Sequence, residues 1–296
     1  MTAADAILLK KRPGAPVACR NAPQNPASES YPVGAMQGFN AKRRFQHAGP
    51  PGAAHYQYAY LLSYPISIQQ ERICMKIIGL NASPKGTNSN TLRLVNAVLA
   101  GAKDEGAETE FLDLYTRHIE YCTACSTCYA TGQCILLDDF TDIFDTILNS
   151  DGIVLGAPNY VDSVPAPMKA LFDRMADAIH CQMLTGKYGC SVCTAGGSGE
   201  QEVMGYMNKV LTTLGATVVG GIGVAIGRDP SALGKAEKEA YTLGKTLAQS
   251  IRGEHAYPEQ DEVHRQKREY FCQLVKHNKD RFAHEYEWYV QMGWMK

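Results

Sequence analysis

Short strand-like runs, most of them continuously apolar, alternate with amphipathic stretches between residues 75 and 251. The runs have the length of buried parallel strands, and the stretches between them repeat apolar residues every three or four positions, as helices do. The predicted strands cover residues 77–80, 109–115, 152–157, 188–194 and 216–225. One predicted helix begins at residue 89, and the others cover residues 139–148, 167–179, 202–214 and 232–251.

This alternation predicts the fold class. Strands that alternate with helices form parallel βαβ units, whose right-handed crossovers place helices on both faces of the sheet. Five units of this size fit an α/β, flavodoxin-like, doubly wound fold with a five-stranded parallel sheet in the order 2-1-3-4-5. Ligands of such sheets bind at the carboxyl ends of the strands, near the switch in strand order. Three loops leave strand ends there, at residues 81–91, 158–167 and 194–199, and we expect them to form one ligand site.

The first loop combines polar side chains with the start of a helix. It lacks the glycine patterns of nucleoside-triphosphate and dinucleotide loops. Side-chain donors instead gather at the positive end of a helix dipole, where backbone N–H groups are also unpaired. The donors are Ser83, Lys85, Ser89, Asn90 and Thr91. This set predicts a site for a single phosphate monoester; a capped turn with a solvated lysine is the alternative.

The other two loops suit a planar ligand. The second loop offers a tyrosine ring, backbone amides and a proline-stiffened chain, which together provide a flat wall and a few hydrogen bonds. The third loop is rich in glycine, which lets the backbone approach a ligand closely because no Cβ intervenes. Plain surface loops are the alternative for each.

A run of four closely spaced cysteines, in the pattern Cys-x-x-Cys-x-x-Cys-x5-Cys, is the most specific motif in the chain: Cys122, Cys125, Cys128 and Cys134. Four thiolates on one tight loop suit a cubane iron–sulfur cluster. Zinc also accepts four thiolates, although its ligands more often come as two separated pairs. Soft thiolates exclude magnesium and calcium. The spacing favours a cluster and leaves free or redox-switching thiols, and zinc, as alternatives.

The other cysteines and the histidines form no such pattern. Cys190 and Cys193 lie three apart in a predicted buried strand, where they face opposite sides, so we interpret them as small buried hydrophobic residues. Cys181 is isolated. Asp138 and Asp139 precede a predicted helix and are interpreted as helix caps rather than metal ligands. The histidines without ligand spacing, which we expect at the surface, are His180, His255, His264, His277 and His284.

Composition narrows the function classes. The chain has 296 residues, a net charge of −1 and a sequence pI of about 6.7, so it lacks the basic excess of a nucleic-acid-binding protein. No apolar run approaches the roughly 18 residues of a membrane span. The chain opens without the charged-then-apolar pattern of a signal peptide. We therefore expect a cytoplasmic protein that contacts neither nucleic acid nor membrane and keeps its cysteines reduced.

Three segments differ in pattern. Residues 1–74 are rich in proline and lack periodicity, so we predict an extension that is disordered or that follows a misassigned start codon. Residues 75–253 form the α/β domain with its cysteine-rich loop at 122–134. Residues 254–296 form a C-terminal helical extension that packs on this domain or on a neighbouring subunit. Within it, residues 259–294 are predicted helical, with an apolar stripe of Val263, Tyr270, Phe271, Leu274, Val275 and Phe282.

Several motifs resemble the NADPH-dependent FMN reductase family. They are Ser83-Pro84-Lys85 with Ser89-Asn90-Thr91, Ala157-Pro158-Asn159-Tyr160, Ser163-Val164-Pro165-Ala166-Pro167-Met168-Lys169 and Thr194-Ala195-Gly196-Gly197. The chain is most similar to the iron–sulfur flavoprotein branch, from about residue 75 to its end. Ala82 stands where many relatives have glycine.

The resemblance implies FMN as cofactor and a [4Fe–4S] cluster on the four cysteines of the loop. It implies that the phosphate binds to Ser83, Lys85, Ser89, Asn90 and Thr91. It places the isoalloxazine ring between Pro158, Asn159 and Tyr160 on one side and Thr194, Gly196 and Gly197 on the other, with Ser163 as a further contact.

These observations predict an FMN-dependent oxidoreductase that transfers electrons between a reduced donor, NAD(P)H or ferredoxin, and an acceptor. No side chain stands out as an acid or base, and none is given a catalytic role. The alternatives are a cluster-free NAD(P)H-dependent flavin or quinone reductase, a non-catalytic flavin electron carrier or redox sensor, and a metal-stabilised interaction protein. The resemblance also implies a homo-oligomer, a dimer or a tetramer.

Overall fold

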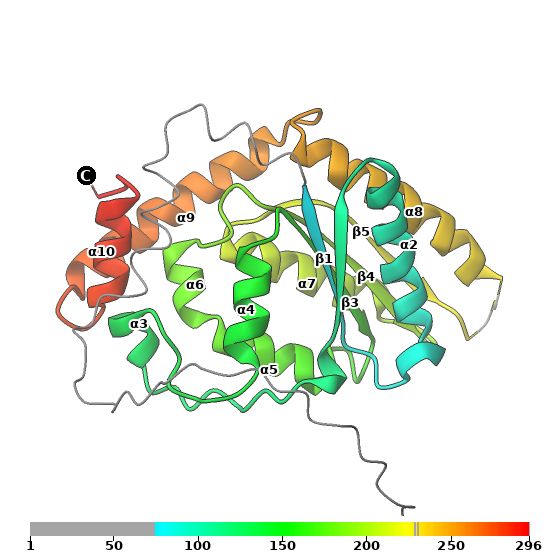
Figure 1. The fold of residues 1–296 in the computed structure, drawn as a ribbon, viewed down its shortest axis with the longest axis horizontal. Coiled ribbons are helices and arrows are strands. Elements are labelled where there is room, and N and C mark those ends of the chain that lie inside the picture. The colour runs from blue at the N-terminus through cyan, green and yellow to red at the C-terminus, as the bar shows by residue number, and fades with distance from the viewer. Residues whose placement is uncertain (1–74, 228, 230, 296) are drawn as a thin grey trace, which may run out of the picture. The chain divides into compact units, whose positions relative to one another are not determined.

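Five parallel strands form one sheet in the computed structural model, which describes residues 75–227, 229 and 231–295 (Figure 1). They pair in the order β2-β1-β3-β4-β5. The strands are β1 (Lys76–Asn81), β2 (Glu108–Asp113), β3 (Gly152–Pro158), β4 (Tyr188–Ala195) and β5 (Thr217–Ala225). This is the predicted order, so the flavodoxin-like, doubly wound fold is confirmed. The predicted extension at residues 1–74 lies outside the described residues.

Helices cover both faces of the sheet (Figure 1). On one face, α2 and α8 pack against Ile77 and Val154; on the other, α4, α5 and α7 pack against Ile78 and Leu80. Neighbouring residues of β1 thus serve opposite cores, because side chains alternate along a strand. The helices are α2 (Asn90–Asp104), α3 (Thr127–Thr131), α4 (Phe140–Leu148), α5 (Ala166–Arg174), α6 (Ala176–Cys181), α7 (Glu200–Leu214), α8 (Ala232–Ile251), α9 (Pro258–His277) and α10 (Ala283–Gln291).

Two predicted boundaries in the α/β part are wrong. The second strand ends at Asp113, whose carboxylate accepts the N–H of Tyr115 at 3.0 Å and opens the 3₁₀ helix η3 (Leu114–Thr116). Such a local side-chain bond competes with extension of the strand. The helix predicted at 167–179 is two helices, α5 and α6, because the backbone at Met175 leaves the helical region with φ −88° and ψ 23°.

The C-terminal tail is also two helices rather than one. Asn278 closes α9, since its side-chain amide donates to the carbonyl of Leu274 at 2.9 Å. The predicted apolar stripe is wrong at two positions: Val263 is 40% exposed and Tyr270 is 67% exposed. Phe282, by contrast, is buried as predicted.

The tail packs on the same chain, next to the cysteine-rich loop. In α10, the indole Nε1 of Trp288 donates to the carbonyl of Cys181 at 2.8 Å, and the phenol of the buried Tyr289 donates to the carbonyl of His180 at 3.0 Å. Tyr129 of α3 stacks on the His180 ring with centroids 4.9 Å apart. The tail therefore forms part of the wall behind the loop, and the described residues belong to one compact unit. The domain boundary at residue 253 stays a prediction.

No helix within the described part of the chain combines the length and the apolar composition that crossing a membrane requires.

Candidate functional site

Hydrogen bonds join the three predicted ligand loops at the carboxyl ends of β1, β3 and β4. The hydroxyls of Thr91 and Thr194, both buried, are 2.6 Å apart and link the first loop to the third. Asn159 links the second loop to the third: its backbone N–H donates to the carbonyl of Thr194 at 2.8 Å, and its side-chain Nδ2 donates to the carbonyl of Ser198 at 2.7 Å. The structure thus brings the three loops into one site.

The first loop presents hydroxyl groups at the start of α2. Ser83 and Ser89 are buried, and each hydroxyl already accepts a backbone N–H, from Lys85 at 3.4 Å and from Leu92 at 3.0 Å. A hydroxyl that accepts in this way keeps its own proton for donation. The backbone N–H groups of Asn90 and of the following residue lie in the first turn of α2, where helices have no internal acceptor.

Charge around this helix start also suits an anion. No acidic residue lies in the first turn of α2, and the exposed Lys85 precedes the short 3₁₀ helix η2 (Gly86–Asn88). The positive end of the α2 dipole is therefore not neutralised by the chain itself. The hydroxyls of Ser83 and Ser89 and the start of α2 could therefore hold an anion such as a phosphate monoester.

The second loop is tight, strained and exposed. Tyr160 and Ser163 exchange backbone hydrogen bonds of 2.9 and 3.2 Å, and the two residues between them have left-handed backbones, Val161 with φ 53° and Asp162 with φ 54°. This region disfavours a β-branched residue, and strain of roughly 1–3 kcal/mol per residue is concentrated at ligand and switch sites. Val161 is 99% exposed, so its position is not explained by core packing.

The third loop leaves open space. A Cβ atom placed on Gly196 or Gly197 would meet no atom within 4 Å, so these glycines are not required for packing inside the chain. Gly199 is different: its φ is 82°, and a Cβ there would come 2.4 Å from Nδ2 of Asn159. Gly199 therefore permits the bond between the second and third loops, whereas the other two glycines leave backbone accessible to a ligand.

Three buried side-chain amide atoms lack hydrogen-bond partners beside these loops. Of the residues that the structure describes, Asn81 has no hydrogen-bond partner at either side-chain atom, and Asn159 has none at Oδ1. Buried polar atoms are nearly always satisfied. The Oδ1 atom of Asn159 is an acceptor at the position where the second and third loops meet.

Tyr115 is a further aromatic residue at this end of the sheet, in a position that the sequence did not reveal. It was expected as the last residue of a strand, but it lies in η3 beside Tyr160. Burial and the nearby Tyr160 phenol raise the pKa of Tyr115. Both rings are partly exposed, at 41% and 43%, and lie at the same end of the sheet. In the sequence, the signal for this position was an aromatic residue at the end of the strand that pairs with β1.

The cysteine-rich loop lies apart from these loops and contains α3. Two of its four sulfur atoms accept an N–H group: Cys122 from the backbone of Ala124 at 3.4 Å, and Cys134 from the side chain of Arg174 at 3.1 Å. Left-handed backbones at Ala124, with φ 54°, and Ser126, with φ 61°, curl the chain between the cysteines. Donors aimed at sulfur stabilise thiolates, the form that binds metals.

The thiols differ in acidity. Hydrogen bonds from the hydroxyl and backbone of Thr127 lower the pKa of the exposed Cys125. Burial and the neighbouring charges of Asp177 and Cys134 raise the pKa of Cys128 to about 11. Without a bound metal, Cys128 therefore stays protonated at neutral pH, whereas metal coordination would remove its proton.

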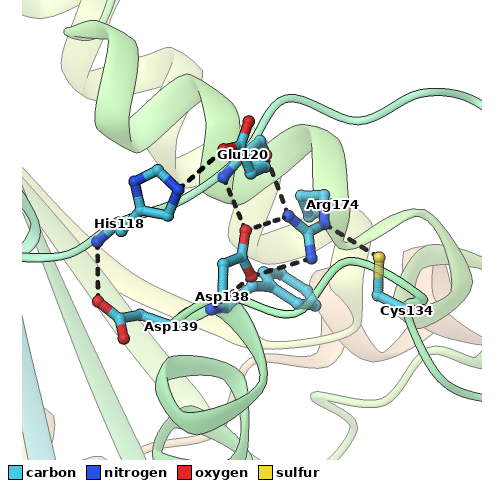
Figure 2. Close-up of polar contacts among 7 residues, drawn as sticks. His118, Glu120, Cys134, Asp138, Asp139 and Arg174 are labelled. Atoms are coloured by element: carbon cyan, nitrogen blue, oxygen red, sulfur yellow. Dashed lines mark hydrogen bonds and ion pairs between the residues drawn. The ribbon is translucent and has the colours of Figure 1, made fainter.

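Arg174, the last residue of α5, holds the base of this loop (Figure 2). Its guanidinium forms a two-point ion pair with Asp138 at 2.8 and 3.2 Å, donates to the carbonyl of Glu120 at 3.0 Å and donates through Nε to the sulfur of Cys134 at 3.1 Å. The side chains of Arg174 and Asp138 are 1% and 0% exposed. Segments on both sides of the cysteines are thus bound to one buried cation.

The two aspartates act partly as predicted. Asp138 accepts the backbone N–H of Phe140 at 3.1 Å, which caps α4, but it also accepts the N–H of Glu120 at 2.7 Å besides pairing with Arg174. Asp139 does not cap the helix through its side chain, which accepts the N–H of His118 at 2.8 Å instead (Figure 2).

The interpretation of the two strand cysteines is confirmed, whereas the interpretation of the histidines as surface residues is wrong in part. Cys190 and Cys193 are buried and belong to opposite cores, as predicted. The surface interpretation is wrong for His264, which is 5% exposed. It is also wrong for His284, which packs between helices together with the buried Cys181, and for His180, whose side chain is 17% exposed and pairs with the buried Glu285. Sequence spacing could not reveal this contact because α6 and α10 are far apart in the chain.

Comparisons with known proteins agree with the fold and with the motifs. Residues 75–231 match the NADPH-dependent FMN reductase family. An iron–sulfur flavoprotein of Archaeoglobus fulgidus is 32% identical over 224 residues, covering 75% of this chain and 100% of that protein. An iron–sulfur flavoprotein of Methanosarcina thermophila is 30% identical over 149 residues, covering 49% of this chain and 78% of that protein. A solved flavone reductase, with 20% identity and a TM-score of 0.51, covers 62% of this chain and 65% of its own and shares the fold.

We predict that Arg174→Leu lowers the free energy of unfolding by about 3–5 kcal/mol at pH 7, because it leaves the Asp138 charge buried and unpaired. Burial alone would raise the pKa of Asp138, but bonds from Arg174 and from two backbone N–H groups lower it. A lowered folded-state pKa stabilises the fold above the unfolded value of about 4, and this stability is lost as pH falls through the folded value. The destabilisation should therefore shrink at acidic pH.

Arg93→Leu is the matched control, since Arg93 forms a two-point pair with Glu237 at 2.6 and 2.9 Å but its side chain is 52% exposed. Its cost should be about 0–1 kcal/mol. Denaturant unfolding from pH 7 to pH 3 measures both variants. Equal losses for Arg174→Leu and Arg93→Leu would contradict the buried ion pair as the support of the loop.

Proposed function

The chain belongs to the NADPH-dependent FMN reductase family, in its iron–sulfur flavoprotein branch, and is a flavin-dependent oxidoreductase; we propose that it passes electrons between a reduced donor, NAD(P)H or ferredoxin, and an acceptor, with a [4Fe–4S] cluster on the loop at residues 122–134. Its cofactor is FMN, which when bound accepts a hydride or single electrons.

The residues at the carboxyl ends of the strands fit FMN. The phosphate would bind the hydroxyls of Ser83, Ser89 and Thr91, the start of α2 and the side chains of Lys85 and Asn90. The ring would lie between two groups of residues, Pro158, Asn159, Tyr160 and Ser163 in the second loop and Thr194, Gly196 and Gly197 in the third. The unpartnered Oδ1 atom of Asn159 and the open space over the glycines support this assignment.

The observation that carries the cluster proposal is the placement of Cys122, Cys125, Cys128 and Cys134 on one loop, with N–H donors on the sulfur atoms of Cys122 and Cys134. Such bonds stabilise thiolate ligands and tune the potential of an iron–sulfur centre, which exchanges one electron at a time. Arg174 contributes a full positive charge at Cys134. The chain's part is to hold four thiolates in place and to leave Cys122 and Cys125 exposed toward a protein donor.

A cluster-free NAD(P)H-dependent flavin or quinone reductase is the second candidate. The four cysteines of the loop are free thiols in the structure, and two of them, Cys122 and Cys125, are exposed. In that case the loop would be a structural or redox-switching element.

The setting and assembly are also proposed. All eight described cysteines are free thiols, which supports a reducing, cytoplasmic setting. We propose a homo-oligomer, a dimer or a tetramer, without contacts to nucleic acid or membrane. The net charge of −1 supports the absence of a nucleic-acid partner.

Ser83→Ala should weaken FMN binding by about 10- to 100-fold and leave riboflavin binding unchanged, because a hydrogen bond to a charged group contributes about 1.5–3 kcal/mol and riboflavin lacks the phosphate. Fluorescence titration of the flavin-free chain measures both affinities. Ser198→Ala, at an exposed position outside the proposed phosphate set, should change neither. An equal loss of affinity for FMN and for riboflavin would contradict binding of the phosphate by Ser83.

The donor is tested with anaerobic protein, a quinone acceptor and three donors in turn: NADPH, NADH and reduced ferredoxin. Cys125→Ala should abolish turnover driven by ferredoxin and keep FMN bound, because Cys125 is an exposed residue of the cysteine-rich loop and is not among the proposed FMN ligands. Cys190→Ala, a buried thiol in β4, should retain turnover.

The outcomes separate the candidates. Ferredoxin-driven turnover that is equal in wild type and Cys125→Ala would contradict electron entry through the loop and would support the cluster-free reductase. FMN-loaded protein that fails to turn over with each of the three donors would indicate an electron carrier or sensor.

A further inference from the structure

Three metal-ligating side chains meet behind the cysteine-rich loop, at the contact between α6 and α10. Asp177 and Cys181 lie four residues apart on α6 and so share one face of that helix. His284 is the second residue of α10. The ligand atoms of the three residues all lie within 4.8 Å of one another. Asp177 and Cys181 are buried, and His284 is largely covered.

The spacing of these atoms matches a single tetrahedral zinc ion. Zinc bonds of about 2.0–2.2 Å to nitrogen and oxygen and about 2.3 Å to sulfur imply N–O edges of about 3.3 Å and S–O edges of about 3.5 Å. The Nδ1 atom of His284 is 3.3 Å from Oδ1 of Asp177, and the Cys181 sulfur is 3.8 Å from the same oxygen. The third pair, the Cys181 sulfur and the His284 nitrogen, lies within 4.8 Å.

The histidine ring is oriented for this role. Its Nδ1 atom faces Asp177, and its opposite edge packs on Gly132, where a Cβ would come 2.6 Å from Nε2. Gly132 has a φ of 72° and ends α3. The glycine therefore leaves room for a ring that directs one nitrogen toward the carboxylate and the thiol.

The surroundings supply negative charge and supporting hydrogen bonds. Glu285, which is fully buried, lies 2.9 Å from Nδ1 of His180 and close enough to Asp177 for the two carboxyl groups to interact. Metal ligands are commonly oriented by such outer partners. Two carboxyl groups, of Asp177 and Glu285, and two imidazoles, of His180 and His284, thus surround the Cys181 thiol.

We propose that Asp177, Cys181 and His284 form a zinc site, separate from the cysteine-rich loop, that fastens the C-terminal helix α10 to α6. The mixed thiolate, imidazole and carboxylate set selects zinc over magnesium or calcium. Water completes the shell, as in other zinc sites with three protein ligands. Binding releases the proton of Cys181 and any proton on Nδ1 of His284, so affinity falls as pH falls.

Cobalt(II) is the spectroscopic probe, because a thiolate bound to it gives a charge-transfer band. The loop would also bind cobalt, so the titration uses the full-length chain with Cys122, Cys125, Cys128 and Cys134 replaced by serine. We expect one equivalent of cobalt with a thiolate band, displaced by zinc. The band should disappear in Cys181→Ala and in His284→Gln, and remain in Cys190→Ala, which removes an equally buried thiol.

Circular dichroism shows whether each variant is folded. A folded serine-loop chain without a thiolate–cobalt band, or a band that persists in His284→Gln, overturns the proposal. The wild-type chain provides an independent readout: zinc should raise the Tm by mass action, and His284→Gln should reduce that rise. An equal rise in both contradicts the site. Neither readout depends on FMN or on iron, so failure here is distinct from failure of the proposed function.

Discussion

A buried ion pair between Arg174 and Asp138 organises the region that distinguishes this chain from a simple flavodoxin-like domain. Burying a charge is costly, and it is tolerated only when the pair is well hydrogen-bonded. Both partners are hydrogen-bonded. The carboxylate accepts from the guanidinium and from two backbone N–H groups, and the guanidinium donates to the carbonyl of Glu120 and to the sulfur of Cys134. The guanidinium also lies over the ring of Phe140, 4.5 Å from its centroid. One residue at the end of a helix therefore fixes a loop that has few apolar contacts of its own.

The same helix connects the two candidate centres. The helix α5 begins at Ala166, directly after the loop that is proposed to hold the flavin ring, and ends at Arg174, beneath the cysteines. Nine helical residues span about 13 Å. A change in the position of α5 would move the flavin loop and the cysteine-rich loop together. The tail supports the loop from another side, where Tyr129 stacks on His180 and α10 closes over α6.

The sequence sufficed for the parts of the structure that depend on local periodicity. Apolar runs and helical spacing predicted the strands, their order and the meeting of the three loops, because parallel strands present their carboxyl ends on one edge. Helix breaks at Met175 and Asn278 were missed, since they depend on local backbone geometry and one side-chain bond rather than on periodicity. The role of Arg174 and the contact between Cys181 and His284 were also missed. Both join segments that are distant in the chain, and spacing carries no information about such contacts.

The central claim is that one chain holds both FMN and an iron–sulfur cluster. The most direct measurement is the absorption spectrum of anaerobically purified protein, with FMN, iron and acid-labile sulfide assayed on the same sample. The account predicts flavin bands above a broad absorbance, with one FMN, about four irons and about four sulfides per chain, as a cubane requires. A clean flavin spectrum without iron would contradict the cluster, and protein that binds no flavin would contradict the account as a whole.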